Sequence, residues 1–152
     1  MKLKAQVLIV DDNDDVREVL AMILEAAGYD TAEARNGCEA IELARQTMPD
    51  VILMDVFMPE LDGIRASEII RGEASPTGVP IILQTARASA AREHEELFFE
   101  VLPKPSDPDA VLESLDRALA NRPPTRTNLV LQKRGATAKL EDSGIHSGAA
   151  PA

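Results

Sequence analysis

The sequence predicts a doubly wound α/β domain built on a five-stranded parallel sheet. Within 152 residues, short apolar runs alternate five times with amphipathic segments of helix length. The run over 51–54 (VILM) is apolar at every position, which is typical of a strand buried on both faces. Each return to a parallel strand needs a crossover, usually a right-handed one through a helix. The alternation therefore indicates helices on both faces of one sheet.

The first half of the chain begins with a strand over 6–10 and a clearly delimited helix over 14–27. Asn13 or Asp14 serves as the cap of this helix, and Gly28 ends it. Its apolar residues recur at helical spacing, namely at Val16, Val19, Leu20, Ile23 and Leu24. The elements that follow are a strand over 29–34, a helix over 37–47 closed by Pro49, and the strand over 51–54.

The second half continues the same alternation. Pro80 is acceptable as the first residue of a strand. The last helix has Asp107 as its cap and Pro108 as its first helical residue, and the domain ends near Asn121. The predicted elements are a helix over 64–73, a strand over 80–84, a helix over 88–98, a strand over 100–102 and the helix that begins at Pro108.

Charge and composition divide the chain into two parts. Acidic residues outnumber basic ones by 26 to 16, for a net charge of −10. Residues 122–152 hold five basic and two acidic residues, a charge of +3, which leaves −13 for residues 1–121. We expect residues 1–121 to form the domain and 122–152 to be a mobile, basic extension rich in Pro, Gly and Ala. The acidic domain argues against direct DNA binding and favours bound cations.

The composition also indicates where the protein works. The apolar runs are too short to span a bilayer, and the N-terminus lacks the apolar core of a secretory signal. Cys38 is the one cysteine, so no intrachain disulfide can form. We therefore expect a cytoplasmic protein with no membrane insertion.

Chemically reactive side chains follow four of the predicted strands. Asp11 and Asp12 come after the first strand, Asp55 after the third, Thr85 after the fourth and Lys104 after the last. The carboxyl ends of parallel strands share one edge, where open α/β folds bind their ligands. At ~4 Å and an effective dielectric of about 20, each pair of carboxylates there repels by about 4 kcal/mol. The site therefore requires a cation, and oxygen ligands favour Mg²⁺, with Mn²⁺ as an alternative.

These side chains match the requirements of phosphoryl transfer. A carboxylate such as that of Asp55 can accept a phosphoryl group as an acyl phosphate. Thr85 can donate its hydroxyl to one phosphoryl oxygen, Lys104 can place its ammonium against another, and the metal can neutralise the third. The sequence thus predicts one site in which Asp55, Thr85 and Lys104 carry the chemistry.

The same residues stand in motifs that resemble the receiver domain of two-component response regulators over residues 5–120. The resemblance implies a flavodoxin-like (βα)5 fold with strand order 2-1-3-4-5. It also implies a signalling domain without turnover of an external substrate, and we expect it to stand alone, because about 30 residues after the last helix are too few for a core-bearing effector domain. The matching motifs, in the order and spacing of the family, are Val10-Asp11-Asp12, residues 54–63 (MDVFMPELDG), Thr85-Ala86 and Lys104-Pro105.

The resemblance also implies roles for the individual residues. Asp12 and Asp55 would bind Mg²⁺ directly, Asp11 through water, and the Phe57 backbone carbonyl would be a further ligand. Asp55 would accept the phosphoryl group from a histidine kinase or a histidine phosphotransfer protein, and a downstream protein would read the result. The Lys104–Pro105 peptide bond is expected to be cis, since X-Pro is the one bond for which cis is inexpensive.

Two features depart from the family pattern. Receivers usually carry an aromatic residue three positions before the lysine, and Val101 stands there instead. The stretch from Thr85 to Lys104 is also a few residues shorter than usual. Phe98 and Phe99 lie nearby, and we expect them to be packing residues rather than substitutes for the aromatic.

Three other functions remain open at this point. The missing aromatic fits a receiver-like interaction module that works without phosphorylation. A Mg²⁺-dependent phosphatase with an aspartate nucleophile generally has a second acid two residues after that nucleophile, where this chain has Phe57. A flavin or nucleotide site is disfavoured, because the first loop is acidic where a phosphate cradle needs Gly-rich backbone donors.

Overall fold

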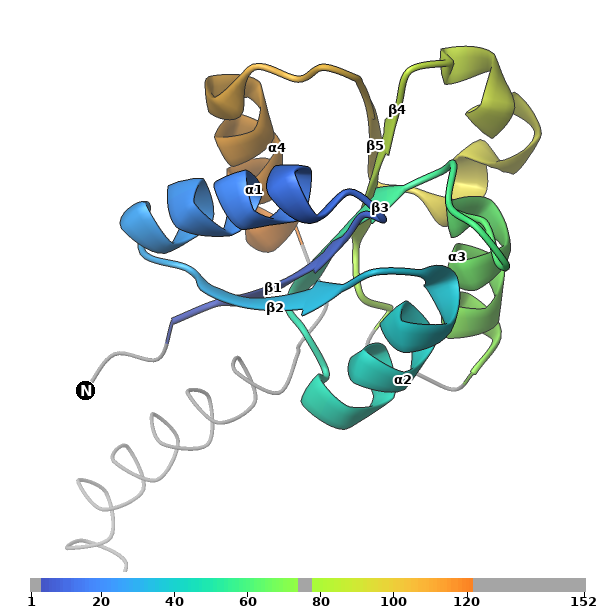
Figure 1. Cartoon of the computed structure of the whole chain (residues 1–152), viewed down its shortest axis with the longest axis horizontal. Helices are drawn as coiled ribbons and strands as arrows, with labels where there is room; N and C mark the ends of the chain where they lie inside the picture. The colour runs from blue at the N-terminus through green and yellow to red at the C-terminus, as the bar shows by residue number, and fades with distance from the viewer. Residues whose placement is uncertain (1–3, 74–77, 122–152) are drawn as a thin grey trace, which may run out of the picture.

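The computed structural model describes residues 4–73 and 78–121 and contains a five-stranded sheet covered on both faces (Figure 1). The strand order is β2-β1-β3-β4-β5, and each neighbouring pair is parallel. The predicted fold class and strand order are therefore confirmed. The strands are β1 (Gln6–Val10), β2 (Asp30–Ala34), β3 (Val51–Asp55), β4 (Ile81–Thr85) and β5 (Glu100–Pro103).

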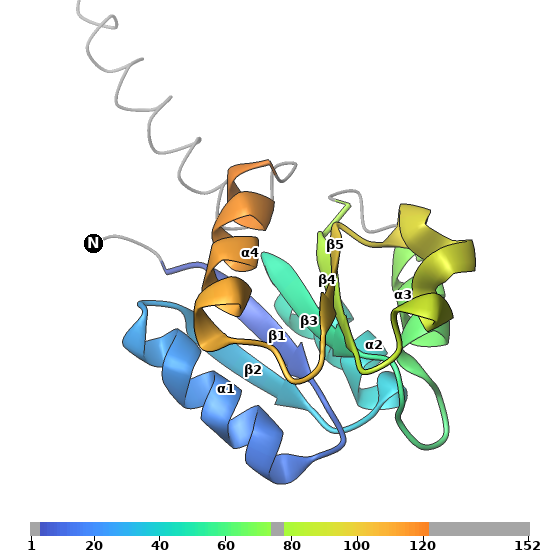
Figure 2. The ribbon, with the colours of Figure 1, turned by 90° about the horizontal axis from the view of Figure 1, so that it is seen from above.

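Helices lie on both sides of this sheet, as Figure 2 shows. One face is covered by α1 (Asp14–Ala26) and α4 (Pro108–Ala120). The other is covered by α2 (Gly37–Thr47), α3 (Gly63–Gly72) and η1 (Ala88–Leu97). None of the helices in the described ranges is long and apolar enough to cross a membrane.

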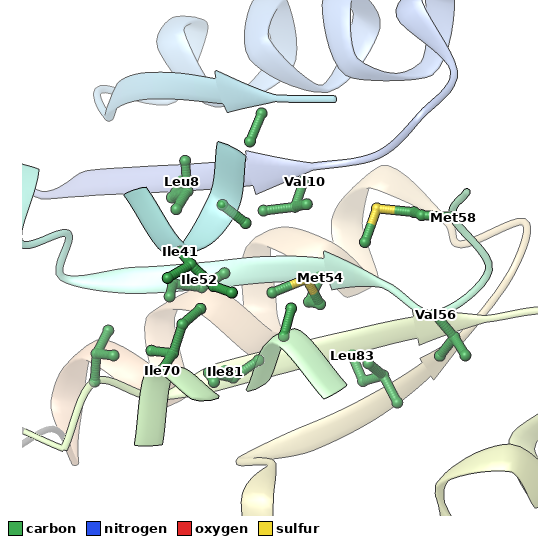
Figure 3. Close-up of a cluster of buried hydrophobic side chains, with 14 of the residues drawn as sticks. Leu8, Val10, Ile41, Ile52, Met54, Val56, Met58, Ile70, Ile81 and Leu83 are labelled. Carbon is green, nitrogen blue, oxygen red and sulfur yellow. The ribbon is translucent and has the colours of Figure 1, made fainter. Parts of the chain in front are cut away.

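The sheet has a separate hydrophobic core on each face. Side chains alternate along a strand, so Leu8 packs toward α2 and α3 whereas Val7 packs toward α1 and α4. All five residues of β3 and of β4 are buried, as expected for central strands of a two-sided parallel sheet. The larger core lies on the α2 and α3 face, and Figure 3 labels Leu8, Val10, Ile41, Ile52, Met54, Val56, Met58, Ile70, Ile81 and Leu83.

The helix starts follow the capping residues in the sequence. Asn13 is the cap of α1, and its side chain accepts a hydrogen bond from the Val16 N–H. Asp107 caps α4 ahead of Pro108, as predicted. Gly28 has φ +98°, a left-handed conformation that glycine adopts readily, and it lies just beyond the end of α1.

The predicted helix over 88–98 is present, but it is not an α-helix. The segment is a 3₁₀ helix, and the φ and ψ angles of His94 (−133° and 22°) break it. Its first residue follows Arg87, which provides no side-chain cap, and only Ala91 is buried. Three glutamates near its C-terminus oppose the helix dipole, so neither capping nor packing favours a regular α-helix.

Other boundaries differ from prediction by a residue or two. Both β3 and β4 continue through the functional residues Asp55 and Thr85, which were predicted to follow the strands. The main-chain pairing of Asp55 with Gln84 and of Thr85 with Pro103 fixes these two positions within the sheet. The predicted extension over 122–152 lies outside the described residues.

Gly63 allows the β3–α3 connection to fold back against the end of β3. Its N–H donates to the Val56 carbonyl at 2.9 Å. A Cβ atom at position 63 would lie 1.9 Å from the Asp55 carbonyl oxygen and 2.9 Å from Met54 Cγ. These distances leave no space for any side chain, so glycine is required for this close approach.

We expect Gly63→Ala to lower the free energy of unfolding by about 2–3 kcal/mol, because the added methyl group must displace backbone. Urea unfolding measures this change. Gly72→Ala is the matched control, since a Cβ there meets nothing within 4 Å. Alanine also favours a helix by roughly 0.5–1 kcal/mol over glycine. Equal stability of the two variants would contradict the steric argument.

Candidate functional site

The parallel strands bring four connecting segments to one edge of the sheet. The segments after β1, β3, β4 and β5 all leave from the carboxyl ends of their strands. In Figure 2 the arrowheads of β1 and β2 point to this edge. Ligands of open α/β sheets bind at such an edge, beside the point where strand order reverses. Here that point lies between β1 and β3.

Three carboxylates meet at this edge, as predicted. Asp11, Asp12 and Asp55 each offer an oxygen atom, and these atoms all lie within 4.8 Å of one another. Asp11 and Asp55 are buried, with 1% and 5% of their surface exposed, whereas Asp12 is exposed. The group is an all-oxygen donor set, which suits a hard divalent cation.

Lys104 provides the positive charge that the buried acids need. Its Nζ lies 2.5 Å from Asp11 Oδ2 and 3.3 Å from Asp55 Oδ1. The Lys104 N–H also donates to the Thr85 carbonyl, at 2.9 Å. The peptide bond between Lys104 and Pro105 is cis, as predicted. The lysine therefore bridges Asp11, directly after β1, and Asp55, the last residue of β3.

The electrostatics of the site follow from burial and from this ion pair. Burial raises the pKa of Asp55 above its ordinary value, and the nearby charges of Asp11 and Asp12 add to the rise, while Lys104 opposes it only in part. Burial by itself would lower the pKa of Lys104. The hydrogen bond to Asp11 and the charge of Asp55 outweigh burial, so the pKa of Lys104 is raised and the side chain stays charged.

Thr85 lies at the same edge, but its hydroxyl points elsewhere. The side chain is buried. Its Oγ1 accepts a hydrogen bond from the Arg87 N–H at 3.0 Å and donates to the Arg87 carbonyl at 3.1 Å. Within the described ranges, these are its hydrogen bonds, and neither reaches an acid or Lys104. The structure thus gathers the acids and the lysine and holds the threonine hydroxyl in its own turn.

Phe57 and Arg87 form a contact that the sequence pattern did not predict. Phe57 is 52% exposed, and the Arg87 guanidinium carbon lies 5.7 Å from the centroid of its ring, within cation–π range. The pair joins the loop after β3 to the loop after β4. A contact between loops distant in the sequence leaves no local pattern from which to predict it.

Arg17 is a second residue that was not predicted. It lies on α1 and is buried, and its Nη1 donates to the Asp11 carbonyl at 2.8 Å. The sequence offers one hint, because Asp14 stands three residues earlier on the same helix and pairs with it. The contact with Asp11 depends on how the chain turns after β1.

Val101 and the two nearby phenylalanines differ in how they pack. Val101 is half-buried and packs against the core on the α2 and α3 face. Phe98 packs against the same core, as expected. Phe99 is 38% exposed, so its prediction as a packing residue is wrong.

Comparison with known proteins identifies the family. The model of the response regulator receiver domain matches residues 7–116. The chain therefore belongs to the response regulator receiver domain family, whose members act in two-component signalling and not by turnover of an external substrate.

Individual relatives agree with this assignment. The chain is 33% identical to the protein PilH of Pseudomonas aeruginosa over 119 residues, which cover 76% of this chain and 98% of PilH. It is 40% identical to the regulatory protein AtoC of Escherichia coli over 75% of this chain, but spans 25% of AtoC. The solved structure of chemotaxis protein CheY4 of Vibrio cholerae superposes with a TM-score of 0.72 at 31% identity, covering 77% of this chain and 100% of that one.

We expect Asp55→Asn to stabilise the metal-free protein at neutral pH. The folded-state pKa of Asp55 is raised, so the folded state holds this proton more tightly than the unfolded state, where the pKa is about 3.9. Wild-type stability therefore falls as pH rises from about 4 through the raised pKa. Each unit of that rise corresponds to about 1.4 kcal/mol in favour of the asparagine variant.

Urea unfolding in EDTA across this pH range measures the difference. The exposed Asp30 provides the control variant, Asp30→Asn, which should follow the wild-type curve. An Asp55→Asn curve parallel to that of wild type at every pH would contradict the electrostatic argument.

Proposed function

We propose that this chain is a single-domain response regulator that accepts a phosphoryl group on Asp55 in a Mg²⁺-dependent reaction. The donor is a histidine kinase or a histidine phosphotransfer protein. The phosphorylated form then signals by binding a downstream protein. The observation that carries the proposal is the cluster in which Lys104 bridges Asp11 and Asp55 beside Asp12.

The donor set fits a magnesium ion. Asp12, Asp55 and the Phe57 carbonyl would hold it, with Asp11 acting through water. When bound, Mg²⁺ would offset the carboxylate charges and polarise the phosphoryl group. The exposure of Asp12 supports this assignment, because a partly hydrated ion needs a ligand that faces solvent. Manganese has the same preference for oxygen ligands.

Asp55 supplies the nucleophile. One of its carboxylate oxygens attacks the phosphorus of a phosphohistidine, the P–N bond breaks, and the imidazole leaves with a proton from the donor or solvent. The product is an acyl phosphate on Asp55. Position favours the reaction, because Asp55 sits at the end of a buried strand and is held in a fixed place.

Lys104 and Thr85 serve the transferred group. Lys104 already lies 3.3 Å from Asp55 Oδ1, and its ammonium can follow the negative charge as it moves onto the phosphoryl oxygens. The Thr85 hydroxyl must turn away from the Arg87 backbone to reach another oxygen. Ala86, directly after the threonine, leaves room for the group.

The comparisons support the wider assignment. PilH matches this chain over 98% of its length, which favours the single-domain type, with the receiver over residues 1–121. The net acidic domain disfavours direct DNA binding, so the output is a protein contact. Cytoplasmic location, without membrane insertion, follows from the proposed donor.

A second function is supported by two observations. Val101 replaces the usual aromatic, and the Thr85 hydroxyl is engaged with the Arg87 backbone. Both features suit a receiver-like module that presents one surface whether or not it carries a phosphoryl group. The two functions differ in one measurable quantity, the dependence of partner affinity on phosphorylation.

We expect phosphoramidate or acetyl phosphate with Mg²⁺ to add one phosphoryl group to the wild type, detected by intact mass. Asp55→Asn and chelation by EDTA should abolish the addition. Lys104→Met should slow it by about 10²-fold, the usual effect of removing one stabilising donor.

Asp62→Asn is the matched control, because Asp62 caps α3 by accepting from the Arg65 N–H at 2.8 Å and an asparagine oxygen can do the same. This variant should be labelled like wild type. Labelling of Asp55→Asn at the wild-type rate would refute the assignment of Asp55.

Partner capture distinguishes the two functions. Immobilised wild type and Asp55→Ala, each with phosphodonor, are compared in a pull-down, and the captured partner's affinity is then measured with and without phosphodonor. We expect at least a tenfold change for wild type, which is about 1.4 kcal/mol of coupling, and none for the variant. Equal wild-type affinities would instead establish the phosphorylation-independent module.

A further inference from the structure

Arg17 is a buried cation beneath the acidic loop that follows β1. It is 8% exposed, and all three of its nitrogen atoms are engaged. Nη1 donates to the Asp11 carbonyl at 2.8 Å, Nη2 to Asp14 Oδ1 at 2.5 Å and Nε to Glu33 Oε1 at 3.3 Å. Burial of a guanidinium is costly unless its donors are satisfied, so these contacts fix its position.

The contact with Asp11 completes the support of that residue. The Asp11 N–H donates to the Ala34 carbonyl at 3.1 Å, and its side chain binds the Asn13 N–H and Lys104. Arg17 holds the remaining polar group, the carbonyl. Because the Asp11 carbonyl and the Asp12 N–H belong to one planar peptide, Arg17 sets the orientation of the peptide that leads into Asp12.

Asp12 depends on this backbone support more than Asp11 and Asp55 do. It is exposed, and within the described residues its carboxylate makes no hydrogen bond or ion pair, whereas Asp11 and Asp55 are both tied to Lys104. Its direction is therefore set by the main chain. Magnesium tolerates little deviation from octahedral geometry, so a shift of this peptide would degrade the donor set.

Arg17 also pairs with two acids close to the site. The run from Asp11 to Asp15 contains four aspartates, and Arg17 pairs with Asp14 and, across the sheet edge, with Glu33. These two carboxylates are thereby neutralised and held away from the site. None of the three acids whose oxygens converge, Asp11, Asp12 and Asp55, has a guanidinium partner within the described residues.

We propose that Arg17 is a positioning residue for the cation site, which holds the Asp11–Asp12 peptide in the orientation that metal binding requires. The inference rests on the proposed function, since it assumes that the acids bind Mg²⁺. A positioning role and a purely electrostatic role for Arg17 predict opposite changes in cation affinity when the residue is replaced. Removing a nearby positive charge would by itself strengthen cation binding, whereas loss of positioning weakens it.

The test is the Mg²⁺ dissociation constant of the full chain by isothermal titration calorimetry, without phosphodonor. We expect Arg17→Met to weaken binding by about tenfold or more, the usual effect of removing a group that orients metal ligands. The amide ¹⁵N shift of Asp12 should also change in the metal-free variant. Unchanged or tighter Mg²⁺ binding would overturn the proposal.

Arg71→Met is the matched control for a general loss of stability. Arg71 is another partly buried arginine, and it donates to the Leu97 carbonyl far from the acids. Its replacement should lower stability and leave Mg²⁺ affinity at the wild-type value. If Arg71→Met weakens Mg²⁺ binding as much as Arg17→Met does, the effect is not one of positioning and the proposal fails.

Two further outcomes keep the result unambiguous. Where Arg17→Met does not fold, Arg17→Lys retains the charge but not the planar fork, and we expect weaker Mg²⁺ binding from it as well. Wild-type affinity in that variant would overturn the proposal. Absence of Mg²⁺ binding by the wild type itself would refute the metal assignment, and this result would be seen before any variant is measured.

Discussion

The ion pairs of Lys104 with Asp11 and Asp55 are the interaction on which the rest of the site depends. Two buried carboxylates at the end of a sheet are unstable without a counter-charge, and the lysine provides one from the segment directly after β5. One lysine cannot neutralise three acids, so the edge keeps a net negative charge that a cation can offset. The net negative charge of the three acids therefore favours a bound cation.

The backbone around this edge is fitted closely enough to keep the charges in place. Gly63 lets the loop after β3 fold against the Asp55 carbonyl, and Arg17 holds the Asp11 carbonyl from the opposite face. Both features involve the main-chain carbonyl groups of these aspartates and not their carboxylates. The carboxylates therefore stay close together despite their repulsion, and the stability needed to hold them comes from the two apolar cores.

Much of this arrangement could be predicted from the sequence, because a parallel sheet converts order along the chain into position in space. Residues that follow strands must meet at one edge, and this rule gathered Asp11, Asp12, Asp55 and Lys104 correctly. The rest could not be predicted because it depends on packing, capping and turn geometry that leave no periodic pattern. The 3₁₀ geometry of η1 reflects missing packing and capping, and the direction of the Thr85 hydroxyl depends on a turn that periodicity does not describe.

Because position 101 is a valine and not an aromatic residue, any conformational change at the site must involve other residues, and Thr85 is the nearest candidate. Its hydroxyl is bonded twice to the Arg87 backbone, so movement of the hydroxyl toward a phosphoryl oxygen must release both bonds, each worth roughly 1 kcal/mol. Arg87 also lies against Phe57 and directly precedes η1. η1 buries only Ala91 and has no side-chain cap, and Arg71 of α3 holds its last residue by donating to the Leu97 carbonyl. If Asp55 is phosphorylated as proposed, Arg87 would link Thr85 to the exposed Phe57 and to η1 without an aromatic side chain at position 101.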